Sequence, residues 1–451
     1  MQLALLSTAA DFTEAMMRFL LATLTVFLTL SSVFSWDPGP APGVKIKNFI
    51  LYLLVMGLVL SYASGRKFKI QLPAMNVSFI VLIGYSILTY LAIVLFIDYP
   101  RYNMLTSAFD LKNRAVDYML FFLVFFYGTR SEKDAMFVLK CLLLSWILSH
   151  AVAVLDALGH LHIGDIERRG DGRVQGAVGE SNQYGAFVAL TLPAAVAMAV
   201  AVKGWQRWFW IAASALTAGT LLMTVSRGAF VATFVATVAG AYLFRRYLSL
   251  GKIVTWGMAA GGAMVVILLL VSISFGDLLY ERVVAGFSKD MGDTSSGRTE
   301  IWATAIEMMF QYPLTLLTGF GWNAYWVMPF RYSPHNYYLA QWFNLGLPGL
   351  ICSILLLVIP ARTALQSFTV APRHLRAPLA GFVVATVAYA TATFFVDLYV
   401  PWIYFWAYAG VTMRIAMIAR ETVPEPAAVE QPVSVTPPRA DAYGWIGAVR
   451  H

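Results

Sequence analysis

Four short polar segments interrupt a chain that is otherwise strongly apolar. They read "GRVQGAVGESNQYGAF" (172–187), "SRGAF" (226–230), "SGRTEIWATA" (296–305) and "SPHNYYL" (333–339). Between them they supply arginines, a histidine and several amides. Arginine grips pyrophosphate through its planar fork of N–H groups, and a neutral imidazole accepts a proton from a hydroxyl group. These residue types suit a substrate that carries both a pyrophosphate and sugar hydroxyls.

His335 opens a long apolar run. Ser333 precedes Pro334, which fits a first helical position, so Ser333 is the expected N-cap and His335 lies in the first helical turn. The positive end of the helix dipole keeps such an imidazole neutral near pH 7, as a general base requires. A histidine bonded to loop backbone near the cap is an equal alternative. Arg331 and Asn336 flank it as polar candidates for substrate contact.

Two arginines stand at predicted helix starts. Arg298 follows a polar turn and is a candidate phosphate ligand, although pairing with Glu300 would make it an ordinary surface residue. Arg227 is the lone charge between residues 208 and 244. An arginine in apolar membrane costs about 2.5 kcal/mol or more, so it indicates function. The alternative is an arginine that reaches the headgroups from a turn favoured by Gly228.

Two further segments offer contacts to a substrate. In 172–187, glycines permit close backbone approach, and Arg173, Glu180 and Asn182 supply donors and acceptors; Asn182 is also a possible N-cap. In "GFGWNAYWVMPFRY", Trp322 and Tyr325 belong to an aromatic cluster. Such rings ordinarily mark the membrane interface, and they also stack on sugar rings.

The composition places these segments in an all-α polytopic membrane protein. Of its 451 residues, 59% are hydrophobic and 12% are charged, whereas soluble domains contain about 25% charged residues. Apolar runs of helical length predict about twelve transmembrane helices. They lie near 15–35, 48–63, 77–97, 115–128, 136–158, 183–202, 207–225, 228–244, 253–275, 336–360, 378–397 and 400–419.

Basic residues predict the orientation. With both termini in the cytoplasm, the short inner connections are rich in Lys and Arg, as the positive-inside rule requires. The net charge of +8 therefore reflects topology, and no nucleic-acid partner is expected. We predict a transmembrane domain over 1–420 with a partly helical periplasmic loop at 276–335. A Pro-rich cytoplasmic tail over 421–451 is predicted to be disordered.

The four segments, in this order and spacing, resemble the O-antigen ligase and O-antigen polymerase superfamily of bacterial inner-membrane glycosyltransferases. The ligases are the closer match, and the likeness extends over nearly the whole chain. The resemblance implies a GT-C-like enzyme that needs no metal or other cofactor. Its donor would be a glycan linked to undecaprenyl pyrophosphate in the periplasm, and its acceptor a hydroxyl group of lipid A–core.

The resemblance also implies residue roles. Arg227 and Arg298 would hold the pyrophosphate, and His335 would orient or deprotonate the acceptor hydroxyl. The resemblance implies inversion at the anomeric carbon. Arg173 and Asn182 match family positions less closely. The family often has Asn-Pro-Asn where this chain has "ESNQ", so Glu180 is a departure whose role the resemblance does not supply.

Other functions fit the same sequence. A polymerase would use this donor to extend another lipid-linked glycan, and a protein-glycosylating relative would use a protein hydroxyl. A transporter of an anionic glycolipid would also have many spans and buried arginines. No repeat relates the two halves of the chain, which disfavours a transporter. A non-catalytic scaffold would leave Arg227 and His335 unexplained.

Overall fold

The structure of the chain is a computed structural model that describes most of its residues. The described residues are 2–33, 45–64, 71–97, 99–161, 173–247, 250–281, 297–328, 330, 334–397 and 401–421. Within these ranges all regular secondary structure is helical and no strand occurs. Arg331, Ser333 and the predicted tail after residue 421 lie outside the described residues.

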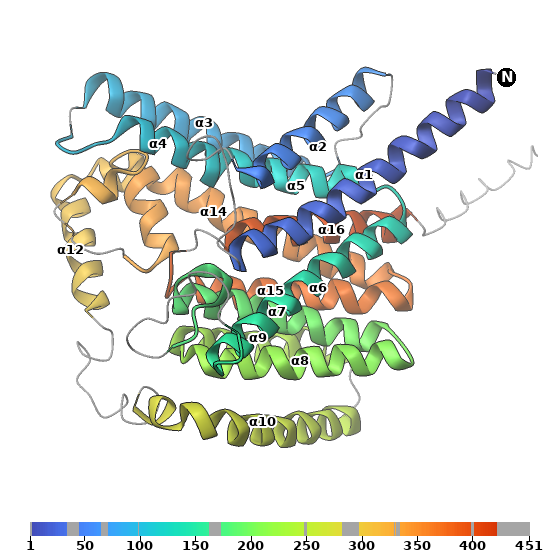
Figure 1. The fold of residues 1–451 in the computed structure, drawn as a ribbon. Coiled ribbons are helices and arrows are strands. Elements are labelled where there is room, and N and C mark those ends of the chain that lie inside the picture. The colour runs from blue at the N-terminus through green and yellow to red at the C-terminus, as the bar shows by residue number, and fades with distance from the viewer. Residues whose placement is uncertain are drawn as a thin grey trace, which may run out of the picture.

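Long helices run side by side to form the body of the molecule (Figure 1). The first half of the chain contains α1 (Gln2–Val33), α2 (Ile46–Ala63), α3 (Pro73–Phe96), α4 (Met104–Leu111), η1 (Lys112–Val116), α5 (Asp117–Gly128), α6 (Glu132–Ala157), η2 (Gly176–Val178) and α7 (Ser181–Ala201). The second half contains α8 (Trp205–Thr224), α9 (Arg227–Leu243), η3 (Arg245–Tyr247), α10 (Leu250–Leu279), α12 (Arg298–Gln311), α13 (Thr315–Thr318), η6 (Ala324–Val327), α14 (Tyr337–Val370), α15 (Arg373–Ala392) and α16 (Pro401–Glu421).

The protein is a multi-pass membrane protein. Seven described helices are long and apolar enough to cross a bilayer, namely α2, α3, α6, α7, residues 261–279 of α10, α14 and α15. The apolar part of α1 and helix α9 are shorter. A helix lies at each of the twelve expected ranges, but the count of twelve spans and the GT-C-like arrangement stay predictions.

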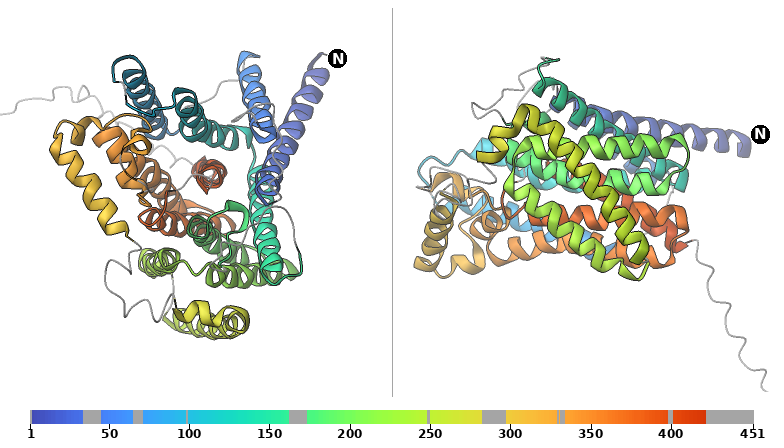
Figure 2. Two further views of the ribbon diagram at one scale, coloured as in Figure 1. Left: turned by 60° about the vertical axis from the view of Figure 1, so that its left-hand side comes forward. Right: turned by 90° about the horizontal axis from the view of Figure 1, so that it is seen from below.

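Helix α16 lies at the centre of the bundle (Figure 2). It packs against α5, α6, α7, α14 and α15, and residues such as Trp402, Phe405 and Tyr408 are almost fully buried. A helix that is apolar on all sides belongs inside a protein. The described side chains of α16 are therefore part of the protein core.

Two irregular features shape one end of the bundle. Helix α12 runs across the ends of the long helices instead of alongside them (Figure 1). Helix α14 breaks at Gly346, whose φ of 60° and ψ of −157° are not helical. The segment after α13 docks at this break, where Gly321 N–H donates to the carbonyl oxygen of Asn344 at 2.7 Å. The polar segments gather at this end.

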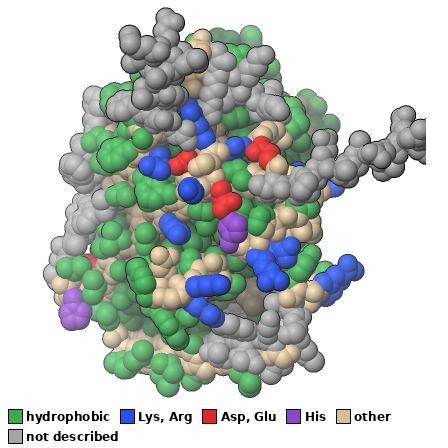
Figure 3. Space-filling model, turned by 90° about the vertical axis from the view of Figure 1, so that its right-hand side faces the viewer, with side chains coloured by type: hydrophobic (Ala, Val, Ile, Leu, Met, Phe, Trp, Pro, Cys, Tyr) green, Lys and Arg blue, Asp and Glu red, His purple; other side chains and the backbone are tan. Residues whose placement is uncertain are grey.

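Basic side chains gather at the opposite end (Figure 3). The connections there include Arg130 between α5 and α6 and Lys203 between α7 and α8. Arg18 pairs with Asp134 at 3.3 Å across the same end. The orientation expected from the sequence, in which this end is cytoplasmic, stays a prediction.

Candidate functional site

The polar segments form turns at the starts of four helices. Glu180 begins α7, with its carboxylate accepting the backbone N–H groups of Asn182 at 3.2 Å and Gln183 at 2.8 Å. Because an ionised side chain at this position satisfies free N–H groups and opposes the helix dipole, it stabilises the turn. Asn182 is therefore not the N-cap. The departure at Glu180 has a structural role of its own.

Arg173 ties this turn to the neighbouring one. Its side chain is 5% exposed. Nε donates to the carbonyl oxygen of Thr224 at 3.0 Å, and Nη2 donates to Oδ1 of Asn182 at 2.8 Å. Ser226 Oγ donates to the same Oδ1 at 3.3 Å. Arg173 and Asn182 thus connect the start of α7 to the α8–α9 turn through hydrogen bonds.

The α8–α9 turn presents Arg227 as the first residue of α9. The left-handed residue in the turn is Val225, with φ of 47°. Gly228, which the sequence suggested as the turn former, is helical. A Cβ there would come within 2.6 Å of Phe395, so this glycine allows α9 to approach the α15–α16 connection. That approach brings Arg227 near the residues that precede α16.

Arg298 is the first residue of α12 and lies near three other charged groups. Burial lowers the pKa of its guanidinium; Glu180 and Asp397 oppose that decrease, and Arg227 adds to it. Its Nε is buried and has no hydrogen-bond partner among the residues described. The expected partner Glu300 is exposed. The two like charges of Arg227 and Arg298 repel each other, and Arg298 has an N–H group without a partner among the described residues. Such a pair of arginines suits an anion with several oxygens.

His335 precedes α14 instead of lying in its first turn. The N-cap is Asn336, whose Oδ1 accepts the N–H of Leu339 at 3.0 Å, so the expectation of a Ser333 cap was wrong. His335 has a left-handed backbone with φ of 46°. The indole of Trp302, on α12, donates to the carbonyl oxygen of Pro334 at 2.6 Å. The turn is therefore held between α12 and α14.

Asp397 completes this turn, and the sequence analysis did not select it. Its carboxylate accepts the N–H of His335 at 3.2 Å and that of Asn336 at 3.0 Å. Burial raises the pKa of Asp397 to about 7, although both N–H groups and Arg298 lower it. The signal that could have found it is a lone acid between apolar runs, in "FFVDLYV", because ionisable residues are costly there.

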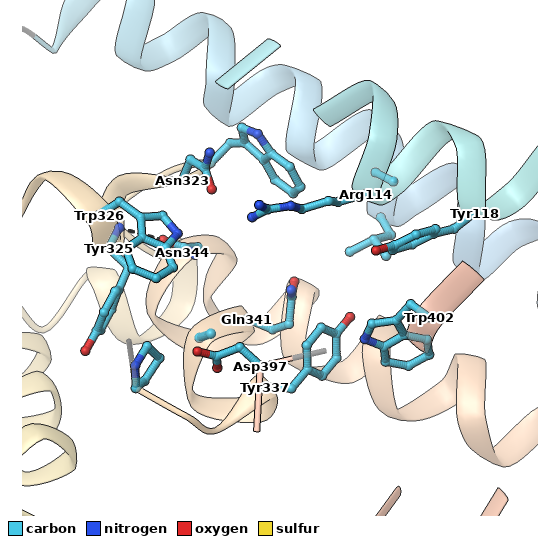
Figure 4. A pocket seen from close by; sticks show the side chains of 15 residues that line it. Arg114, Tyr118, Asn323, Tyr325, Trp326, Tyr337, Gln341, Asn344, Asp397 and Trp402 are labelled. Atoms are coloured by element: carbon cyan, nitrogen blue, oxygen red, sulfur yellow. Dashed lines mark hydrogen bonds between the residues drawn. The ribbon is translucent and has the colours of Figure 1, made fainter. Parts of the chain in front are cut away.

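A cavity of about 60 Å³ adjoins the His335 turn (Figure 4). Trp322 and Tyr325 line it, and both are buried, at 7% and 1% exposure. The Trp322 indole donates to the carbonyl oxygen of Ser107 at 2.9 Å, and Tyr325 stacks on Phe330. Both rings are therefore packed inside the protein. They form part of a polar and aromatic cavity wall.

The structure thus brings together Arg227, Arg298, Glu180, Asp397 and the turn of His335, from segments spread over more than half the chain. Arg173 and Asn182 support this cluster from α7, and Trp322 and Tyr325 line the adjoining cavity. Among the described ranges, no group of three or more His, Cys, Asp or Glu side chains is placed to bind a metal.

Comparison with known protein families gives one match. Residues 212–354 match a family model whose description is O-antigen ligase. The matched stretch contains Arg227, Arg298 and His335, whereas Arg173, Glu180, Asn182 and Asp397 lie outside it. A comparison with curated proteins gives no match.

Proposed function

The chain belongs to the O-antigen ligase superfamily, and from this premise we propose that it transfers a glycan from undecaprenyl pyrophosphate to a hydroxyl group of lipid A–core. Members of this family are membrane enzymes of the ligase or polymerase type, with lipid-linked glycans as substrates in general. The finer assignment concerns the donor, the acceptor and the residues that act on them. The reaction takes place on the periplasmic face of the bacterial inner membrane.

The observation that carries the proposal is the approach of Arg227 and Arg298 to the turn that contains His335. In a medium of low polarity two guanidinium groups repel each other, and a pyrophosphate between them relieves that repulsion. The same contacts stabilise the negative charge that develops on undecaprenyl pyrophosphate as it leaves. This supports placing the scissile bond between the arginines and the histidine.

His335 acts on the acceptor side. Its imidazole takes the proton from the acceptor hydroxyl as the oxygen attacks the anomeric carbon. The new carbon–oxygen bond forms while the bond from that carbon to the pyrophosphate oxygen breaks, with inversion. Asp397 takes no part in the bond changes of this scheme and acts as a positioning residue. By accepting the N–H groups of His335 and Asn336, it fixes the turn from which the imidazole projects.

The experiment that tests the proposal is transfer in proteoliposomes that contain the lipid-linked donor and lipid A–core, run without and with EDTA. Wild type is expected to attach glycan to lipid A–core, and His335→Ala to lose that product. Longer lipid-linked chains in place of this product would make the protein a polymerase. Movement of labelled donor across the bilayer without any product would make it a transporter. Loss of the product on adding EDTA would contradict the metal-independent reaction.

A further inference from the structure

Apart from Asp397, the side chains that line the cavity beside the His335 turn have no role in the proposed reaction. Its polar lining residues are Arg114, Asn323, Gln341, Asn344 and Asp397, and its aromatic lining includes Trp322, Trp326, Tyr337 and Trp402. Neither Arg227 nor Arg298 lines it. Asp397 belongs both to this lining and to the charged cluster around Arg298. The cavity is therefore a second compartment that meets the first at the His335 turn.

Arg114 reaches the cavity from an irregular helical turn. Residues Lys112–Val116 form a π-helix between α4 and α5. Such turns are less stable than α-helical turns and are frequent at functional sites. Asp110 accepts from Arg114 Nη2 at 3.3 Å and from the Asn323 amide at 2.7 Å. One carboxylate thus fixes a guanidinium and an amide on the same wall.

Two groups at the cavity have unused hydrogen-bonding capacity. The Trp402 side chain is 2% exposed, and its indole N–H has no partner among the described residues. The Gln341 amide likewise makes no hydrogen bond to another described residue, and it points toward Arg114 across the cavity (Figure 4). A buried donor without a partner costs free energy, and a bound polar ligand would recover it.

The chemistry of the lining selects among ligands. Aromatic faces beside amides, a guanidinium and an indole N–H suit a ring that has apolar faces and hydroxyl groups around its edge. Because Asp110 already balances the charge of Arg114, a neutral hydroxyl group suits this wall better than a phosphate. At about 60 Å³ the cavity is smaller than a whole pyranose ring, since a cavity that holds benzene measures about 150 Å³. We propose that it receives the hydroxyl-bearing edge of a sugar residue of the acceptor glycan, next to the residue whose hydroxyl meets His335.

This inference rests on the proposed function, because only a transferase has an acceptor. It assigns the two compartments to the two substrates. The donor pyrophosphate lies with Arg227 and Arg298, and the acceptor sugar lies with Arg114, Gln341 and Trp402. The shared Asp397 lies where the two substrates react.

Transfer kinetics with donor and acceptor varied independently test the assignment. Gln341→Ala and Arg114→Gln are expected to raise KM for lipid A–core about fivefold or more, since each loses a hydrogen bond to the sugar. KM for the donor should stay within about twofold. Trp402→Phe keeps a ring and removes the N–H, so it should act in the same direction. Gln366→Ala is the matched control, because Gln366 is exposed on the far part of α14.

The kinetic outcomes distinguish an acceptor site from a donor site at the cavity. A rise in the donor KM alone would assign the cavity to the donor glycan and overturn the inference, as would unchanged kinetics in all three variants. If wild type forms no product at all, calorimetric titration of the purified full-length protein with lipid A–core tests whether the cavity binds the acceptor. Weaker binding by Gln341→Ala than by Gln366→Ala would uphold the acceptor site while the proposed transfer falls. Equal binding by both variants, or no binding by wild type, would overturn the acceptor site.

Discussion

The Asp397 carboxylate accepts the backbone N–H of Asn336 at 3.0 Å, across 61 residues of chain. Its other oxygen accepts the N–H of His335. Asp397 precedes the buried helix α16, and Asn336 caps α14. Asp397 lies between α15 and α16. The position of the His335 imidazole therefore depends on how these two helices pack. Several measurements follow from this dependence.

The pKa of Asp397, which burial raises to about 7, predicts a pH dependence of transfer. Below that pH the carboxyl group is protonated and holds the two N–H groups less strongly, so the rate should fall toward acid with a midpoint near 7. Asp397→Asn should lower the rate at pH 8 about tenfold or more, by loss of charge-assisted hydrogen bonds. It should also flatten the acid limb. Rates measured from pH 5 to 9 check this.

Stability gives an independent reading of the same group. The ordinary pKa of an aspartate is 3.8, so the folded protein holds this proton more tightly than the unfolded chain does. The free energy of unfolding should therefore fall as pH rises from about 4 to about 7, and Asp397→Asn should remove that part of the fall. An acid limb of the transfer rate that persists unchanged in Asp397→Asn would show that Asp397 is not the group that titrates.

Substitution of His335 must respect its left-handed backbone, with φ of 46°. Asparagine tolerates this conformation better than alanine does. We expect His335→Asn to have a Tm close to that of wild type and above that of His335→Ala. Both variants should lose transfer by about a hundredfold or more, the usual contribution of a general base. Transfer within a few fold of wild type in His335→Asn would contradict a role for the imidazole.

Much of the architecture could be predicted from the sequence, because long apolar runs and isolated charges are local signals. The helices and the grouping of Arg227, Arg298 and His335 at one end follow from them. The caps could not be assigned in this way. Asn336 and Glu180 compete with nearby Ser333 and Asn182 for the capping positions, and tertiary contacts decide which residue begins the helix.

Asp397 and Arg114 were missed for different physical reasons. Asp397 is the last residue of the predicted span 378–397, whereas α15 ends earlier, at Ala392. Its role is to accept the backbone N–H groups of His335 and Asn336. These residues lie 62 and 61 positions earlier in the chain, so no local sequence pattern reveals the contact. Arg114 depends on the π-helix at Lys112–Val116. Apolar periodicity does not report such a change in winding.

Arg298 provides a test of pyrophosphate recognition. Lysine keeps the charge but lacks the planar fork that binds two oxygens. Arg298→Lys should raise KM for the donor about tenfold, and Arg298→Gln should raise it further, with KM for lipid A–core unchanged. Arg362→Gln, an exposed arginine on α14 away from the site, is the control. A donor KM unaffected by Arg298→Gln would remove this residue from pyrophosphate binding.

Gly346 and Gly319 hold the segment that carries Trp322 and Tyr325 against α14. Both have positive φ, and a Cβ on Gly346 would come within 2.2 Å of the Leu317 carbonyl oxygen. Backbone cannot yield as a side-chain tip can, so Gly346→Ala should destabilise the protein by about 2 kcal/mol or more. Gly84→Ala is the matched control, since its Cβ would meet nothing within 4 Å and alanine favours a helix over glycine by about 1 kcal/mol. Thermal unfolding in detergent should therefore give a lower Tm for Gly346→Ala and an equal or higher Tm for Gly84→Ala. A wild-type Tm in Gly346→Ala would mean that the break in α14 does not need glycine.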